Sequence, residues 1–257
     1  MIPPILEARG ISRRFGGLVA VDNVTMSIPA GQILGVIGAN GAGKTTFVNM
    51  VTGWTQPSSG SFVLNGRDIT GLSPRTIARL GVTRSFQIPQ VFLNLTVAEN
   101  IAIAQGLAEN SVARLFQSIG EPSRVLGCEA ILDRFSLTHW ADRQVLELPQ
   151  GARKLLDIAM AMTRRPMLLL LDEPTSGVAR EEKFKLMDQV FAAIAGLQVT
   201  VLFVEHDMEI VARYVSRVVA FFQGRVIADG SCDEVLAHEE VREHVVGRTW
   251  VQRGTNA

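Results

Sequence analysis

Cysteines and long apolar runs are scarce in this chain, and each scarcity narrows the class of protein. The two cysteines, Cys128 and Cys232, lie far apart and match no metal-binding spacing. A reduced, cytoplasmic setting therefore fits. The longest apolar runs, such as residues 167–171 and 199–204, have the length of a strand. A membrane-spanning helix needs about 20 apolar residues, so we expect the chain to reach a membrane only through a partner.

An excess of charge and a secretion signal are also missing. The sequence has 25 basic and 25 acidic residues, and nothing in this balance indicates a nucleic-acid-binding surface. The first residues, Met1 to Pro4, lack the charged start and the apolar stretch of a signal peptide. The length of 257 residues is enough for one large domain or two small ones with a sizeable core.

The most informative segment is Gly38-Ala39-Asn40-Gly41-Ala42-Gly43-Lys44-Thr45-Thr46, which fits the phosphate-binding pattern Gly-x-x-x-x-Gly-Lys-[Ser/Thr]. A triphosphate loses water when it binds, and main-chain N–H groups at a helix start can replace that water. The three glycines let the backbone wrap closely at positive φ. Lys44 supplies charge for the outer phosphates, and the Thr45 hydroxyl can hold Mg²⁺.

The surroundings of this loop match the requirement for a strand before it and a helix after it. Residues 32–37 form an apolar run with β-branched members, which predicts a buried strand. Gly53 supplies a stop signal for the helix. Apolar residues recur at helical spacing after the loop, at Phe47, Met50, Val51 and Trp54.

The rest of the chain divides into strands, a helical insertion, and strands again. We expect short strands at 18–21, 24–28 and 61–64, and a helix from Ser73-Pro74 to Gly81. The pair Thr96 and Glu99 predicts a capping box, and the pattern from there to about 165 is helical.

The C-terminal part alternates between strand and helix. Apolar strands at 168–171 and 199–204 predict a parallel sheet, because both read as buried on two faces. The intervening helix is expected to bury Phe184, Met187, Phe191 and Ile194. Ser231 and Glu234 predict the cap of a last helix that ends near Gly247.

Polar groups follow three of these predicted elements. Asp172 and Glu173 end a leucine run, where the first carboxylate can help to hold Mg²⁺ next to Thr45 and the second can orient or deprotonate water. His206 follows the next strand, where a contact with the γ-phosphate is favoured over a structural role.

Gln87 stands where core and insertion join, which favours a role in sensing the nucleotide. Residues 148–154 open another helix, whose free N–H groups can bind an anion, although this segment alone favours an ordinary helix start.

Taken in order, these segments resemble the ATP-binding-cassette (ABC) ATPases over nearly the whole chain. Residues 38–46 match the Walker A loop, Gln87 the Q-loop, 148–152 the signature, and 176–179 the D-loop. The resemblance implies a RecA-like P-loop α/β core (about 1–87 and 166–257) with an antiparallel β subdomain, and an inserted α-helical subdomain (about 88–165). It further implies that Phe15 stacks on adenine and that Gln150 and Gly151 contact nucleotide. Mg²⁺ would be held by Thr45, Asp172 and Gln87. The residues implied in catalysis are Glu173, His206 and Gln87.

Finer resemblance points to the ATPase subunits of branched-chain amino acid importers, on Arg14-Phe15-Gly16-Gly17-Leu18, Arg84-Ser85-Phe86-Gln87 and residues 95–100. It implies a second ATPase subunit, two membrane permease subunits, a substrate-binding protein and a peripheral place on the cytoplasmic face of the plasma membrane. The cargo stays open among branched-chain or other hydrophobic amino acids, small amides and carboxylates.

Two departures from the family pattern bear on assembly. Pro149 and Gln150 replace the usual serine and first glycine of the signature, and Ala179 stands where the D-loop normally has a polar group. Both changes affect the partner's nucleotide site, so we favour a heterodimer whose partner supplies a complete signature. The alternatives are an exporter ATPase of the lipopolysaccharide type, a soluble ABC ATPase, and a non-hydrolysing subunit. The last is disfavoured because Lys44, Glu173 and His206 are all present.

Overall fold

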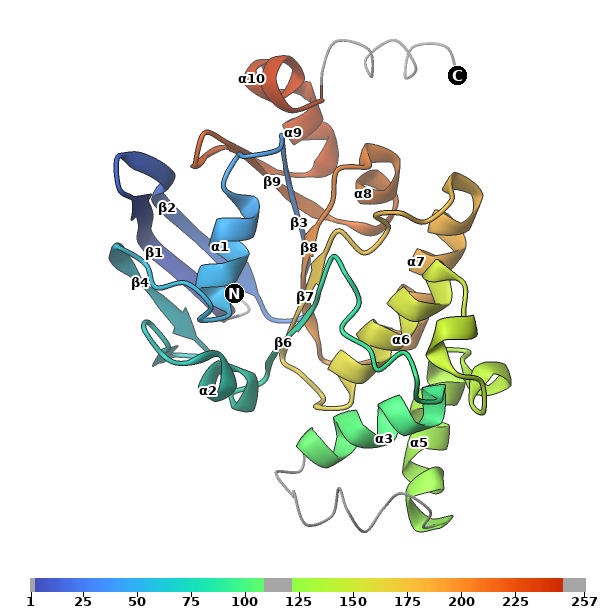
Figure 1. Ribbon diagram of the computed structural model, residues 1–257. Helices are drawn as coiled ribbons and strands as arrows, with labels where there is room; N and C mark the ends of the chain where they lie inside the picture. The colour runs from blue at the N-terminus through green and yellow to red at the C-terminus, as the bar shows by residue number, and fades with distance from the viewer. Residues whose placement is uncertain (1–2, 109–121, 247–257) are drawn as a thin grey trace. The chain divides into compact units, whose positions relative to one another are not determined.

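The computed structural model describes residues 3–108 and 122–246 (Figure 1). Its chain forms two compact units, one made of the residues up to Val82 together with those from Gln198 onward, and one made of Thr83–Leu197. The second unit is larger than the helical insertion expected at 88–165, because it also holds a strand and a helix that follow the insertion. The expected division into core and subdomain stays a prediction.

An antiparallel sheet in the first unit has the strand order β2-β1-β4-β5. The sequence predicted two strands at 18–21 and 24–28, and this was wrong, because one continuous strand runs through both. Asn23 adopts φ 52°, and the register between β1 and β2 shifts around it, as in a β-bulge. The strands are β1 (Pro4–Phe15), β2 (Leu18–Pro29), β4 (Ser59–Leu64) and β5 (Arg67–Asp68).

A second group of strands in this unit carries the phosphate-binding loop. β3 pairs in parallel with β8 on one side and with β9 on the other, and β10 is antiparallel to β9. β8 is buried along its whole length, which explains its uninterrupted apolar sequence. The bounds are β3 (Ile33–Gly38), β8 (Thr200–Val204), β9 (Arg217–Phe222) and β10 (Arg225–Gly230).

Two expectations for the helices of the first unit were wrong. The helix after the loop ends at Val51, and Trp54 lies beyond it with 64% of its surface exposed. The helix capped at Ser231 stops at Ala237, because His238 adopts an extended conformation, and two separate helical segments follow it as far as Val246. The helical segments are α1 (Lys44–Val51), α2 (Pro74–Arg79), α8 (Met208–Tyr214), α9 (Cys232–Ala237), α10 (Glu239–Val241) and a π-helix (Arg242–Val246).

The second unit is mostly helical, and its strands β6 and β7 are neighbours. The capping box of α3 is confirmed, because the Thr96 N–H donates to the Glu99 carboxylate and the Glu99 N–H to the Thr96 hydroxyl. Helix α6 packs against α3 and α7. The elements are β6 (Val82–Ser85), α3 (Val97–Ala108), α5 (Pro122–Arg134), two 3₁₀ turns (Thr138–Trp140 and Val145–Glu147), α6 (Gln150–Met162), β7 (Leu168–Asp172) and α7 (Arg180–Ile194).

The buried face of α7 is rotated from the predicted one. Phe184 and Phe191 are only half-buried, and the fully buried positions are Leu186, Met187, Val190, Ala193 and Ile194. In the two described ranges, no helix combines the length and the apolar character that crossing a bilayer requires.

Candidate active site

The loop between β3 and α1 has the backbone conformation that the sequence predicted. Gly38, Gly41 and Gly43 adopt φ values of 154°, 80° and 102°. A Cβ at Gly38 would lie 2.5 Å from the carbonyl oxygen of Phe221, and a Cβ at Gly43 would collide with the carbonyl oxygen of Ala20. Glycine is therefore required at both positions by conformation and by space.

The start of α1 is built to accept an anion. No side chain among the described residues caps this helix at Gly43, and Thr45 is exposed in its first turn. The buried Lys44 ammonium donates to the carbonyl oxygens of Gly38 at 2.6 Å and of Ala39 at 3.0 Å. The loop thus concentrates N–H groups and one cation at a helix N-terminus, which fits the phosphates of a nucleotide.

The turn between β9 and β10, at Gln223 and Gly224, is hydrogen-bonded to the phosphate-binding loop and was not predicted from the sequence. The Gly224 N–H donates to the Ala42 carbonyl at 2.9 Å, and the Asp22 N–H donates to the Gly224 carbonyl at 2.8 Å. Gln223 and Gly224 both have positive φ, as in a two-residue hairpin turn between β9 and β10. The sequence signal was weak, since Gln-Gly is not one of the pairs, such as Asn-Gly or Asp-Gly, that predict a two-residue hairpin.

The other candidates of the first unit lie at strand ends. Phe15 ends β1 with 46% of its surface exposed, and the Arg13 guanidinium lies 4.4 Å from the centre of its ring. His206 is exposed just beyond β8, and its N–H donates to the buried carboxylate of Glu205 at 2.9 Å. Glu205 was not among the residues predicted from the sequence to lie at the site.

In the second unit, the structure brings two predicted residues together. The Gln87 side-chain amide donates to the Glu173 carboxylate at 2.7 Å, although 86 positions separate them. Glu173 adopts φ 48°, an uncommon conformation for a residue with a Cβ. Asp172, the last residue of β7, forms a buried ion pair with Arg84 of β6. Arg84 was not predicted to contact the acidic pair.

Helix α6 begins at Gln150, as the sequence indicated, and Pro149 precedes it without a capping side chain. The Gln150 amide packs against Gly177, a D-loop residue with φ 74°. Ala179 directly precedes α7. The structure therefore joins the signature and D-loop segments of one chain. A Cβ at Gly151 would lie 3.9 Å from the Val178 side chain, so this position has space for one.

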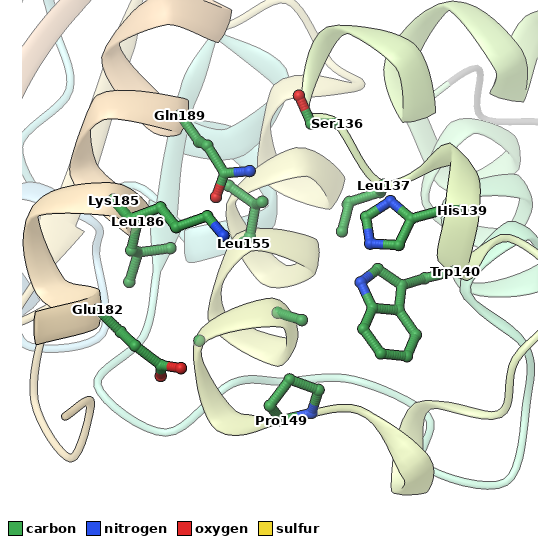
Figure 2. A pocket seen from close by; sticks show the side chains of 12 residues that line it. Ser136, Leu137, His139, Trp140, Pro149, Leu155, Glu182, Lys185, Leu186 and Gln189 are labelled. Carbon is green, nitrogen blue, oxygen red and sulfur yellow. The ribbon is translucent and has the colours of Figure 1, made fainter.

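A pocket of about 190 Å³ lies next to the start of α6. Figure 2 shows Lys185 and Gln189 of α7 pointing towards it from one side, and the rings of His139 and Trp140 facing it from the other. Pro149 contributes its ring to the lining. The residue that replaces the usual signature serine thus presents an apolar surface here and has no hydroxyl to donate.

The donor groups also suit Mg²⁺ held mainly by a nucleotide. No cluster of three or more acidic, histidine or cysteine side chains that could hold a metal occurs in residues 3–108 and 122–246. Mg²⁺ at nucleotide sites takes one or two protein oxygens and completes its shell with phosphate and water. The first unit offers the exposed Thr45 hydroxyl as an oxygen ligand of this kind. The second unit offers the Asp172 carboxylate, which is paired with Arg84.

The predicted site residues divide between the units. The first unit holds Phe15, Gly38, Asn40, Gly41, Ala42, Gly43, Lys44, Thr45, Thr46 and His206, and the second holds Gln87, Gln150, Gly151, Asp172 and Glu173.

Residues 21–176, more than half of the chain, match the family model described as ABC transporter. Together with the loop and the fold, this shows that the chain belongs to the ABC transporter family, as one of its ATP-binding cassettes, the ATPases of these systems.

Individual relatives agree over nearly the full length. The high-affinity branched-chain amino acid transport ATP-binding protein BraF of Pseudomonas aeruginosa is 38% identical over 257 residues, which cover 96% of this chain and 99% of that protein. A crystal structure of a nucleotide-free ATP-binding cassette from an ABC transporter superposes with a TM-score of 0.82 at 31% identity, over 94% of this chain and 98% of that one. The ADP conformation of MJ1267, another cassette of an ABC transporter, gives 0.81 at 32% identity, over 93% and 97%.

Proposed function

We propose that this chain is the ATP-hydrolysing subunit of an importer for branched-chain or chemically related amino acids. The observation that carries the ATPase assignment is the loop at residues 38–46, with its three glycines at positive φ and the buried Lys44 ammonium. The cargo class rests on the similarity to BraF over 96% of the chain. The cargo itself is recognised by other subunits.

In the proposed site, main-chain N–H groups of the loop bind the phosphates, at residues that include Gly38, Asn40, Gly41, Ala42, Gly43 and Thr46. Lys44 exchanges its two carbonyl acceptors for the outer phosphate oxygens, and Phe15 stacks on adenine. Thr45, Asp172 and Gln87 would hold Mg²⁺, which neutralises charge that develops on the phosphate oxygens.

Glu173 orients or deprotonates the attacking water, and His206 contacts the γ-phosphate. The hydrogen bond from Gln87 to the Glu173 carboxylate supports a regulatory role, because it connects the Q-loop side chain directly to the proposed base. Gln87 then releases Glu173 when it turns towards the nucleotide.

We further propose a heterodimer of two ATPase subunits that works with two membrane permeases and a substrate-binding protein at the cytoplasmic face of the plasma membrane. Pro149 and Ala179 support the asymmetry, since neither supplies the polar side chain expected at its position. Gln150 and Gly151 then contact the partner's nucleotide. A purified, active transport assembly that contains only one kind of ATPase subunit would contradict the heterodimer.

The direct test is Lys44→Ala. We expect ATP affinity to fall about 10- to 100-fold, because a charge-assisted hydrogen bond of about 1.5–3 kcal/mol is lost. Equilibrium binding of a slowly hydrolysed ATP analogue measures this. Leucine uptake into vesicles that contain the assembled transporter should stop in the same variant. Unchanged analogue binding would remove the loop from the proposal. A native transporter that takes up neither branched-chain nor chemically related amino acids would overturn the cargo class.

A further inference from the structure

Lys154 is a buried cation that the proposed chemistry does not use. It lies one turn after the start of α6 and is 2% exposed. Its ammonium donates to the main-chain carbonyls of Gln87 and Glu173, each at 3.0 Å. One side chain of α6 is therefore bonded to both residues whose side chains form the Gln87–Glu173 hydrogen bond.

Asp157, one turn further along the same face of α6, binds the Q-loop segment on both sides of Gln87. One carboxylate oxygen accepts from the Ser85 hydroxyl at 2.6 Å and the Phe86 N–H at 3.2 Å, and the other accepts from the Gln90 N–H at 2.9 Å. Burial raises the pKa of this carboxyl, although these hydrogen bonds and the nearby Lys154 charge oppose the shift. The segment from Ser85 to Gln90 is thus anchored to α6 along its length.

We infer that Lys154 is a positioning residue that fixes the main chain of Gln87 and Glu173 to the first turn of α6. The carbonyl of Glu173 belongs to a residue with positive φ, so its side-chain direction depends on what holds that peptide group. Gln150 and Gly151 lie within one turn of Lys154 on the same helix. The signature turn, the Q-loop and the proposed catalytic carboxylate therefore keep one common orientation.

This inference rests on the proposed function, because it assigns Lys154 a role through Gln87 and Glu173. An alternative reading is that Lys154 merely stabilises the fold. The two readings differ in what they predict for kcat when the folded protein binds nucleotide normally.

The experiment compares Lys154→Met with a matched variant of the neighbouring cation, Arg153→Met. Arg153 also donates to two main-chain carbonyls, those of Val145 and Leu146, at 3.1 and 2.6 Å, but neither belongs to the Q-loop or to Glu173. Both variants remove one cation and two such bonds from α6. The full chain is assembled with its transporter partners, and kcat for ATP hydrolysis is measured beside the Kd of a slowly hydrolysed analogue.

We expect Lys154→Met to lower kcat about 10- to 100-fold, the effect of a small displacement of a reacting group, with an unchanged Kd. Lys154→Arg should recover part of kcat, and Arg153→Met should keep it. If Lys154→Met does not fold, Lys154→Gln retains an uncharged donor group on a shorter side chain, and its kcat should fall while Kd holds.

Equal kcat for the Lys154 and Arg153 variants would overturn the inference, as would a fall in kcat that only matches the fraction of unfolded protein. The Lys44→Ala variant separates the two proposals. If it still binds the analogue tightly, the proposed function fails. If it loses binding and Lys154→Met behaves like Arg153→Met, only the role of Lys154 fails.

Discussion

At the scale of single residues, unusual backbone conformations coincide with the proposed chemistry. Gly38, Gly41 and Gly43 hold positive φ at the loop, and Glu173 holds φ 48° after β7. The glycines were predictable, because the motif needs a backbone that wraps closely. The conformation of Glu173 and its bond with Gln87 were not predictable, since they depend on how segments 86 positions apart come together.

Asp157 gives a prediction at this scale. Its pKa is raised by burial from the ordinary value of 3.8, so the folded state binds more protons than the unfolded state between 3.8 and the raised value. Stability from this group is therefore highest below the unfolded pKa and declines as pH rises through that window.

The measurement is the free energy of unfolding by urea from about pH 4 to pH 7, for the native chain and for Asp157→Asn. We expect the native chain to lose stability relative to the variant as pH rises. A difference that stays constant, or that changes in favour of the native chain, contradicts a raised pKa at Asp157.

At the scale of elements, apolar runs and caps were the reliable signals. Strands β3, β7 and β8 and the boxes at Thr96 and Ser231 follow from short sequence patterns that tertiary contacts reinforce. The end of α1 followed only in part, because Gly53 was predicted to stop the helix while Trp54 was counted among its apolar positions. Its apolar spacing continues to Trp54, but the Thr52 hydroxyl bonds the Val48 carbonyl and Gly53 turns to φ 75°. Strands β6, β9 and β10 were missed, although β9 carries the apolar run 218–222.

The β9–β10 turn gives a prediction with a matched control. Gly224→Ala places a Cβ 2.9 Å from the Ala20 carbonyl oxygen, next to the loop that Gly224 braces. Gly66 has nearly the same φ, 78° against 80°, and an added Cβ there meets nothing within 4 Å. Both variants should lose about 1 kcal/mol of stability from positive φ.

Only Gly224→Ala should also weaken nucleotide binding, because the Ala42 end of the loop must shift. Thermal unfolding and analogue binding, measured on both variants, separate the two effects. Equal analogue affinities for Gly224→Ala and Gly66→Ala would show that the turn does not support the loop.

At the scale of the whole molecule, sequence motifs and the full-length similarity to BraF agree on an ATP-binding cassette. The family was identifiable because its motifs occur in order and at their usual places along the chain. The partner arrangement was not, since Pro149 and Ala179 support the proposed heterodimer only through what a second subunit would have to supply. Helix α6 begins at the altered signature, and its residues Lys154 and Asp157 are hydrogen-bonded to the Q-loop segment.

The central claim is that ATP bound at the Lys44 loop is hydrolysed with the help of the Glu173 carboxylate. The most direct measurement follows phosphate release and ATP binding by Glu173→Gln in the assembled transporter. The account predicts that the variant binds ATP with the affinity of the native chain and that phosphate release falls at least about 100-fold, since a general base contributes roughly 10²–10⁴-fold. Phosphate release at the native rate by this variant would contradict it.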